Sequence, residues 1–246
     1  MKSINLFSPN FDAKRRIRKS IKFIIIHYTG MQSTRESLIR LCDPRFKVSC
    51  HFLISRGGTI YNLVNEKYIA WHSGKSHWQK YKNLNKNSVG IELANKGHEF
   101  GYQNFSKKQL SSLVKICKTL MTKYKIKNKN IIGHSDIAPL RKIDPGERFP
   151  WKLLSKKNIG VWHDYDETFL KKLRKIKIYK KKDKLNFFNN LNRIGYKLSQ
   201  ENKSWAKKTT KAFQSHFRKE LVNGIIDEEC LCIAKNLVKK YKNPLI

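Results

Sequence analysis

Short apolar runs separated by polar turns recur along the first part of the chain, and they predict strands. The continuous β-branched run at residues 24–26, in KFIIIHYT, predicts a buried central strand that ends at His27. Two apolar runs around Gly57 and Gly58, in CHFLISRGGTIYNLV, predict a pair of strands joined by a turn. The segment SVGIEL alternates, which predicts a strand with Glu92 on the side opposite its apolar residues. The run NII in NIIGHSDI predicts one more short strand.

Two stretches in the same part have the spacing of amphipathic helices. One begins near Thr34 and carries Leu38 and Leu41 on its apolar side. The other follows Ser106, and Gln109 three residues later completes the pattern of a capping box. Its apolar stripe consists of Leu110, Leu113, Val114, Cys117, Leu120, Met121 and Tyr124. Strands interspersed with helices predict an α/β fold, with a mixed central sheet covered by helices.

The pattern changes in the last third of the chain. The charge-rich segment at residues 163–184 predicts a linker, partly helical, between a first domain at residues 1–162 and a helical domain at residues 185–246. Three amphipathic stretches follow the linker, at residues 185–196, 204–218 and 227–242. They predict a small three-helix bundle, and the last of them begins with acids and ends with lysines, as the helix dipole favours.

The chain has 246 residues and a formal net charge of +35. Such a charge favours a polyanionic partner, such as nucleic acid, anionic lipid or an acidic cell-wall polymer. A bias in composition is an equal alternative, because Lys greatly outnumbers Arg while Ile and Asn are also plentiful. The sequence has no helix-turn-helix, RNA-recognition motif or zinc knuckle, so we expect no nucleic-acid partner.

Cysteine usage and hydropathy argue against several further classes. The five cysteines are an odd number and contain no CxxC pair, which argues against a disulfide framework or a zinc finger. No apolar run reaches about 18 residues, so we expect no transmembrane segment. The amino-terminal segment lacks the apolar core of a signal peptide. The sequence alone therefore leaves a cytoplasmic location and export by another route both open.

Ionisable residues gather in GHSDIAPLRKIDPG, residues 133–146, between glycines and prolines. His134 follows a predicted strand, Asp144 precedes a rigid Pro-Gly turn, and His27 ends another strand. Two imidazoles and one carboxylate suit a catalytic zinc site, which uses three protein ligands and leaves one position open. Each residue alone has an ordinary alternative, because a histidine that closes an apolar strand is commonly a hydrogen-bonded structural residue.

Two charged residues complete the candidate chemistry. Glu92 is a candidate general base beside a metal site, and its alternative is a solvent-facing carboxylate on an open sheet. Lys142, two residues before Asp144, is a candidate for stabilising an oxyanion, and its alternative is one more surface lysine. From the residues alone, these features indicate a zinc hydrolase.

Four blocks in order along the chain resemble the type-2 N-acetylmuramoyl-L-alanine amidases, which are zinc enzymes related to phage amidases and peptidoglycan recognition proteins. The blocks are FIIIHYTG, CHFLISRGGTIYNLVNEKYIAWHSGKS, NLNKNSVGIELAN and GHSDIAPLRKIDPGERFPW. The resemblance covers about residues 20–155. It implies one Zn²⁺ per chain, with His27, His134 and Asp144 as its ligands.

The resemblance also implies roles for Glu92 as the general base and Lys142 as the transition-state stabiliser. The implied reaction is hydrolysis of the amide between the lactyl group of N-acetylmuramic acid and L-alanine. The substrate is then intact peptidoglycan or an (anhydro)muropeptide, and the sequence does not choose between them. The alternative function is a non-catalytic protein that binds or senses peptidoglycan, but such relatives typically lose a metal ligand.

Four more residues of the matching blocks are candidates for contact with the sugar or the stem peptide, namely Trp71, His72, His51 and Asn95. Each has packing within the protein as its alternative. Asp136 lies beside His134 in the sequence, and we expect it to orient that imidazole. For His98 and His216 the sequence indicates surface or packing positions only.

The last part of the chain resembles the three-helix peptidoglycan-binding domain in FNNLNRIGY, TTKAFQSHFR and GIID. Any other three-helix bundle is the alternative. The order of the two domains resembles that of cell-envelope amidases, so we expect a location in the cell envelope or periplasm. A cytoplasmic location stays open because no signal peptide is visible, and the sequence does not indicate the oligomeric state.

Overall fold

The computed structural model describes residues 2–198 and 204–242 of the chain. Its centre is a six-stranded sheet in the order β1-β5-β4-β9-β3-β10, in which neighbours are parallel except for β4 and β5. The strands of this sheet are β1 (Ser3–Asn5), β3 (Phe23–Tyr28), β4 (Phe52–Ile54), β5 (Ile60–Asn62), β9 (Ser88–Leu93) and β10 (Ile131–Gly133). Two small antiparallel pairs are β2 (Phe11–Asp12) with β6 (Ile69–Ala70), and β7 (His77–Trp78) with β8 (Tyr81–Lys82). The predicted fold class is confirmed.

Helices surround this sheet and form the last part of the chain. They are α1 (Thr34–Cys42), α2 (Lys107–Tyr124), α3 (His134–Ile137), α4 (Trp151–Ser155), α5 (Glu167–Leu173), α6 (Lys181–Ile194), α7 (Trp205–Phe217) and α8 (Glu228–Lys242). The helices expected near Thr34 and after Ser106 are confirmed as α1 and α2. No helix in the described ranges is both long and apolar enough to cross a bilayer.

The start of α2 differs in one detail from the predicted capping box. Ser106 Oγ accepts a hydrogen bond from the backbone N–H of Gln109 at 3.1 Å, as expected. The Gln109 side chain is buried and donates to the carbonyl oxygens of Ile54 and Ala94 instead of returning to the helix start. Gln109 therefore ties α2 to the ends of β4 and β9.

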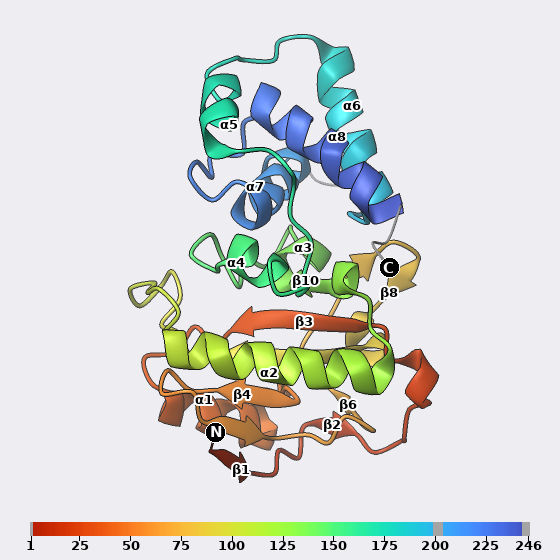
Figure 1. Ribbon diagram of the computed structural model, residues 1–246. Coiled ribbons are helices and arrows are strands. Elements are labelled where there is room, and N and C mark those ends of the chain that lie inside the picture. The colour runs from red at the N-terminus through yellow and green to blue at the C-terminus, as the bar shows by residue number, and fades with distance from the viewer. Residues whose placement is uncertain (1, 199–203, 243–246) are drawn as a thin grey trace.

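The strand β3 contributes side chains to both faces of the sheet. Ile24 and Ile26 belong to a hydrophobic core that includes residues of α2. Phe23 and Ile25 belong to a second core on the other face, shared with the C-terminal helices. Figure 1 shows α2 along the sheet and these helices beyond β3 and β10. Because side chains alternate along a strand, His27 points to the same face as Phe23 and Ile25.

The segment at residues 163–184, for which the sequence predicts a partly helical linker, is helical in two places. It contains α5 and the first turn of α6, which begins at Lys181. Asp166 caps α5 by accepting from the N–H of Phe169 at 2.9 Å. Leu170 buries its side chain in the core that the C-terminal helices share, and Ile178 is buried as well, so two apolar positions among many charges help to anchor the segment.

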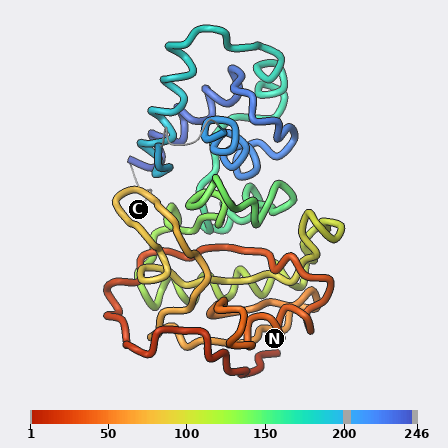
Figure 2. Tube along the Cα trace, turned by 180° about the vertical axis from the view of Figure 1, so that it is seen from behind, coloured from red at the N-terminus to blue at the C-terminus, as the bar shows by residue number. Residues whose placement is uncertain are grey.

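The C-terminal helices, α5 to α8, are joined to the first part of the chain by a shared core. Trp78 of the β7–β8 hairpin is fully buried and lies edge-on to Tyr196, with ring centroids 4.9 Å apart. The N–H of Gln79 donates to the carbonyl of Gly195 at 2.8 Å. Seen from behind, in Figure 2, this hairpin extends from the sheet towards the C-terminal helices. The hairpin therefore helps to hold the C-terminal helices against the first part of the chain.

Candidate active site

Three elements meet where β3 and β10 end. His27 lies near the end of β3, and the parallel neighbour β10 runs directly into α3, whose first residue is His134. The loop after α3 returns to the site at Asp144, and the N–H of Ser135 donates to the Asp144 carbonyl at 2.8 Å. Gly133 is required at the turn, because a Cβ there would lie 2.7 Å from Pro145 Cδ.

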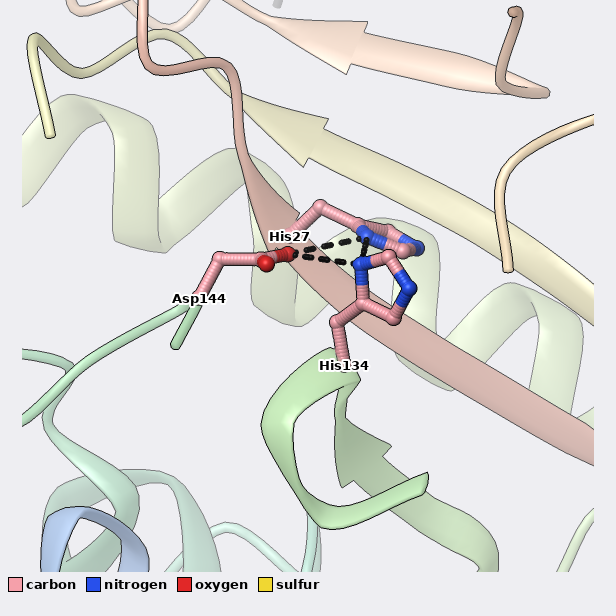
Figure 3. Close-up of side chains that lie close together, drawn as sticks. All are labelled: His27, His134 and Asp144. Atoms are coloured by element: carbon pink, nitrogen blue, oxygen red, sulfur yellow. Dashed lines mark hydrogen bonds and ion pairs between the residues drawn. The ribbon is translucent and has the colours of Figure 1, made fainter. Parts of the chain in front are cut away.

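The side chains of His27, His134 and Asp144 converge on one point, as Figure 3 shows. The two Nδ1 atoms are 2.9 Å apart, and each lies 3.1 Å from Asp144 Oδ2. All three side chains are buried. The two imidazoles hold the pKa of Asp144 far below its usual range, although burial opposes this shift. The structure therefore brings together the three residues that the sequence proposed as ligands.

A chain of hydrogen bonds behind His27 determines which of its nitrogens carries the proton. The Ser88 hydroxyl donates to the Leu84 carbonyl at 2.6 Å, so its oxygen is free to accept from His72 Nε2 at 3.1 Å. His72 Nδ1, 3.0 Å from His27 Nε2, then accepts the proton of that nitrogen. Burial lowers the pKa of His27 to about 4, so the ring is neutral and its Nδ1 carries a lone pair.

The His134 imidazole, like that of His27, directs an unprotonated Nδ1 towards the site. His134 Nε2 lies 3.3 Å from the carbonyl oxygen of Ser73, which only accepts, and 3.4 Å from Arg141 Nη2, which only donates. The Arg141 nitrogen already donates to the Lys75 carbonyl at 2.9 Å, so we assign the Nε2 proton to the bond with Ser73, which leaves Nδ1 without a proton. Two imidazole lone pairs and a carboxylate oxygen then face each other at about 3 Å. Three acceptors this close repel one another unless a cation lies among them. Two nitrogen donors and one oxygen donor fit zinc and leave a further coordination position open.

Glu92 and Lys142 line the same cavity as these three residues. The cavity has a volume of about 470 Å³. Burial, with the charge of Asp144, raises the pKa of Glu92 to about 8, while the charge of Lys142 opposes the shift. Glu92 Oε2 is buried without a hydrogen-bond partner among the described residues. Glu92 is therefore held at the cavity wall with one oxygen available, which suits a proton acceptor or donor.

Of the four residues proposed to contact substrate, His72 lines this cavity and the other three make contacts elsewhere. His51 is buried, accepts from the N–H of Gly90 at 3.0 Å and faces the Tyr68 carbonyl at 3.2 Å. Trp71 and Asn95 behave similarly. The indole of Trp71 donates to Asp12 Oδ1, and the Asn95 amide bonds the backbone of Gly97 and Gln103. The geometry thus gives these three residues structural contacts.

Asp136 is not a partner of the His134 imidazole, contrary to our expectation. Its carboxylate accepts from the N–H of Gly133 and bonds two residues of the C-terminal part, Tyr196 and His216. His134 and Asp136 are only two residues apart in the sequence, but both belong to α3, and side chains two residues apart on a helix point in nearly opposite directions.

His98 and Arg141 line the cavity although the sequence indicated no role for them there. His98 Nδ1 lies 2.8 Å from the Tyr28 hydroxyl, and its Nε2 lies 3.1 Å from a carboxylate oxygen of Glu147. Arg141 donates to the carbonyl of Lys75 at 2.9 Å. In the sequence, the one indication that Arg141 lies at the site was its position next to Lys142, in the segment that carries His134 and Asp144.

Comparison with known proteins now identifies the family. Residues 17–147 match the family model described as N-acetylmuramoyl-L-alanine amidase. The chain belongs to this family. AmiD, an N-acetylmuramoyl-L-alanine amidase of Escherichia coli (strain K12), is 35% identical over 234 residues, which are 90% of this chain and 83% of AmiD. AmpD of Haemophilus influenzae, a 1,6-anhydro-N-acetylmuramyl-L-alanine amidase, is 34% identical over 163 residues, 59% of this chain and 86% of AmpD.

Solved structures of the family have the same fold over nearly the whole chain. AmiD from E. coli, in complex with the substrate anhydro-N-acetylmuramic acid-L-Ala-D-γ-Glu-L-Lys, superposes with a TM-score of 0.79 at 33% identity. The match covers 94% of this chain and 92% of AmiD. AmpDh3 from Pseudomonas aeruginosa, in complex with anhydromuramic pentapeptide, gives a TM-score of 0.79 at 30% identity, over 94% and 95% of the two chains. The chain is therefore an amidase of this family, and the non-catalytic alternative is disfavoured.

Proposed function

We propose that this amidase is a zinc enzyme that hydrolyses the amide between the lactyl group of N-acetylmuramic acid and L-alanine, with one Zn²⁺ per chain. The observation that carries the proposal is the convergence of two imidazole nitrogens and a carboxylate oxygen in the cavity that Glu92 also lines. In this proposal His27, His134 and Asp144 hold the metal. Zinc, when bound, supplies Lewis acidity that activates water and polarises a carbonyl.

The protein's own groups have distinct tasks in this reaction. Glu92 takes a proton from the attacking water and returns it to the leaving amine. Its raised pKa, about 8, makes the protonated form a competent acid, and a nearby cation lowers that pKa towards the working pH. The Lys142 ammonium stabilises the developing oxyanion, a contribution of about 3 kcal/mol for a well-placed donor.

Muropeptides with a 1,6-anhydro sugar are the substrate class that we propose first. AmiD and AmpDh3 are each found in complex with a ligand of this class, and each match covers 94% of this chain. Mass spectrometry of anhydromuropeptides and intact sacculi after digestion tests the proposal. We expect release of the stem peptide with a new free amino terminus on L-alanine, abolished by a chelator and restored by zinc. Release that persists in the chelator would contradict the metal mechanism.

For the C-terminal helices we propose a peptidoglycan-binding role, supported by the sequence blocks around Tyr196, Phe213 and Asp227. Co-sedimentation of the full-length protein with purified sacculi tests this role. DNA-cellulose, a polyanionic material of unrelated chemistry, is the control for binding by charge alone. Retention by both materials with the same salt dependence would indicate charge alone. A location in the cell envelope stays a prediction from the domain order, and fractionation of cells that express the protein checks it.

A further inference from the structure

The Asp136 carboxylate is a junction between the candidate metal loop and the C-terminal helices. It is 1% exposed and accepts three hydrogen bonds. The N–H of Gly133 donates to Oδ2 at 2.8 Å, His216 Nδ1 lies 2.7 Å from the same oxygen, and the Tyr196 hydroxyl donates to Oδ1 at 2.5 Å. Two of the three partners therefore come from the C-terminal part, and the third is the residue directly before His134.

The orientation of both C-terminal partners is fixed by their surroundings. The His216 ring is stacked between Trp151 and Phe217, with ring centroids 4.0 Å and 3.9 Å away. Tyr196 is fully buried against Trp78. Burial and the charge of Asp136 raise the pKa of Tyr196, so its hydroxyl keeps the proton that it donates. Both donors thus reach Asp136 from rigid positions.

Further contacts hold the rest of the same loop from the same side. Ile137 and Ala138, directly after Asp136, belong to the core that the C-terminal helices share with the sheet. The ammonium of Lys208, on α7, donates to the carbonyl of Leu140 at 3.0 Å. Figure 1 shows α3 between β10 and α7. The first half of the chain that joins His134 to Asp144, residues 136–140, is therefore held by contacts with the C-terminal helices.

We propose that the C-terminal helices form part of the metal site, with Tyr196 and His216 as positioning residues that act through Asp136 on His134. The inference rests on the proposed metal function. Its physical basis is that a buried carboxylate that loses a hydrogen-bond donor is destabilised. The Asp136 carboxylate then reorients or binds a water molecule in place of the donor. Either response changes its bond to Gly133, and with it the direction of the His134 side chain. This role goes beyond attachment to the cell wall.

Zinc affinity of the full-length protein tests the proposal without a measurement of activity. Tyr196→Phe and His216→Gln each remove or alter one donor to Asp136. Tyr241→Phe and His163→Gln are the matched controls, since both residues are buried and neither bonds Asp136 among the described contacts. Affinity is measured by competition with a chromogenic chelator, and the absorption spectrum of bound Co²⁺ reports the ligand geometry. Urea denaturation of each metal-free variant identifies conditions in which all are folded.

We expect zinc affinity to fall about tenfold in Tyr196→Phe and in His216→Gln, with a shifted Co²⁺ spectrum, and to change less than about twofold in the controls. A merely structural role lowers the stability of the metal-free protein but leaves the affinity of folded molecules unchanged. Equal affinity and an unshifted spectrum in Tyr196→Phe, the change that removes a single oxygen, would overturn the inference. Wild-type protein that binds no zinc would overturn the proposed function as well.

Discussion

His27 and Glu92 lie directly opposite each other on the neighbouring parallel strands β3 and β9. Both side chains line the same cavity. This pairing explains why a carboxylate interrupts the apolar pattern of SVGIEL: the residues beside it, Ile91 and Leu93, face the core with α2, and Glu92 faces the site. The register of two strands thus sets the position of the candidate base relative to a candidate ligand.

Glu92→Gln tests the base directly. The amide has nearly the same shape but cannot accept the proton from water, so we expect turnover to fall at least about 100-fold. Zinc content stays at about one per chain, because Glu92 is not among the three converging ligands. Turnover and metal content are measured on the same preparation. Glu167→Gln, an exposed change on α5, is the control, and a similar loss of turnover in it would contradict the assignment.

The raised pKa of Glu92 predicts an unusual dependence of stability on pH in the metal-free protein. The carboxyl has a pKa of about 8 in the folded state and about 4.5 when unfolded. Between these values the folded state holds a proton that the unfolded state has released, so the free energy of unfolding falls as pH rises from about 4.5 to about 8. Glu92→Gln has no carboxyl at this position and therefore lacks this dependence on pH. The free energy of unfolding of Glu92→Gln relative to that of the wild type therefore increases between pH 5 and pH 8. Urea denaturation of both proteins with a chelator present measures this difference. A difference that stays constant with pH would refute the raised pKa of Glu92.

The hydrogen-bond chain behind His27 predicts a role for His72 in metal binding. His72→Phe removes the acceptor for the His27 Nε2 proton, so we expect the zinc dissociation constant to rise about tenfold. Gly90→Ala is a second test, because a Cβ at Gly90 would collide with the His72 ring. His77→Phe, five residues further along in β7 and outside this series of hydrogen bonds, is the control. Unchanged zinc affinity in both test variants would show that the chain does not orient His27.

The strands and the residues at their ends could be predicted from the sequence, because their signals are local. A β-branched run, an alternating segment and a loop rich in His, Asp and Pro each fall within a few residues. The resemblance to a known family then joined His27, His134 and Asp144, which no local pattern connects. The protonation of His27 depends on Ser88 and His72, and this dependence is visible only when the strands lie side by side.

The junction with the C-terminal helices could not be predicted, because it depends on partners far apart in the sequence. Asp136 and His216 are separated by 80 residues, and nothing near either residue indicates the other. The sequence indicated only that the segment at residues 163–184 is partly helical and did not locate α5, because this short helix has a single buried residue, Leu170, among many charges. Gln109 matched a local capping pattern, but the backbone carbonyls of two strands were better partners for its buried amide.

A buried ion network within the C-terminal helices predicts a large loss of stability on a single change. Arg218 is 1% exposed and donates to the carboxylates of Asp227 and Glu229, while Arg174 makes a two-pronged contact with Glu229 at 2.6 and 2.7 Å. Arg218→Met leaves the Asp227 carboxylate buried without this partner, which typically costs about 3 kcal/mol. We expect that loss in the free energy of unfolding, measured by urea denaturation. Arg193→Met, an exposed change on α6, is the control and should change stability by less than about 0.5 kcal/mol. A similarly small effect in Arg218→Met would contradict the prediction. It would mean that hydrophobic packing of the methionine stabilises the folded state as much as the ion pairs of Arg218 do.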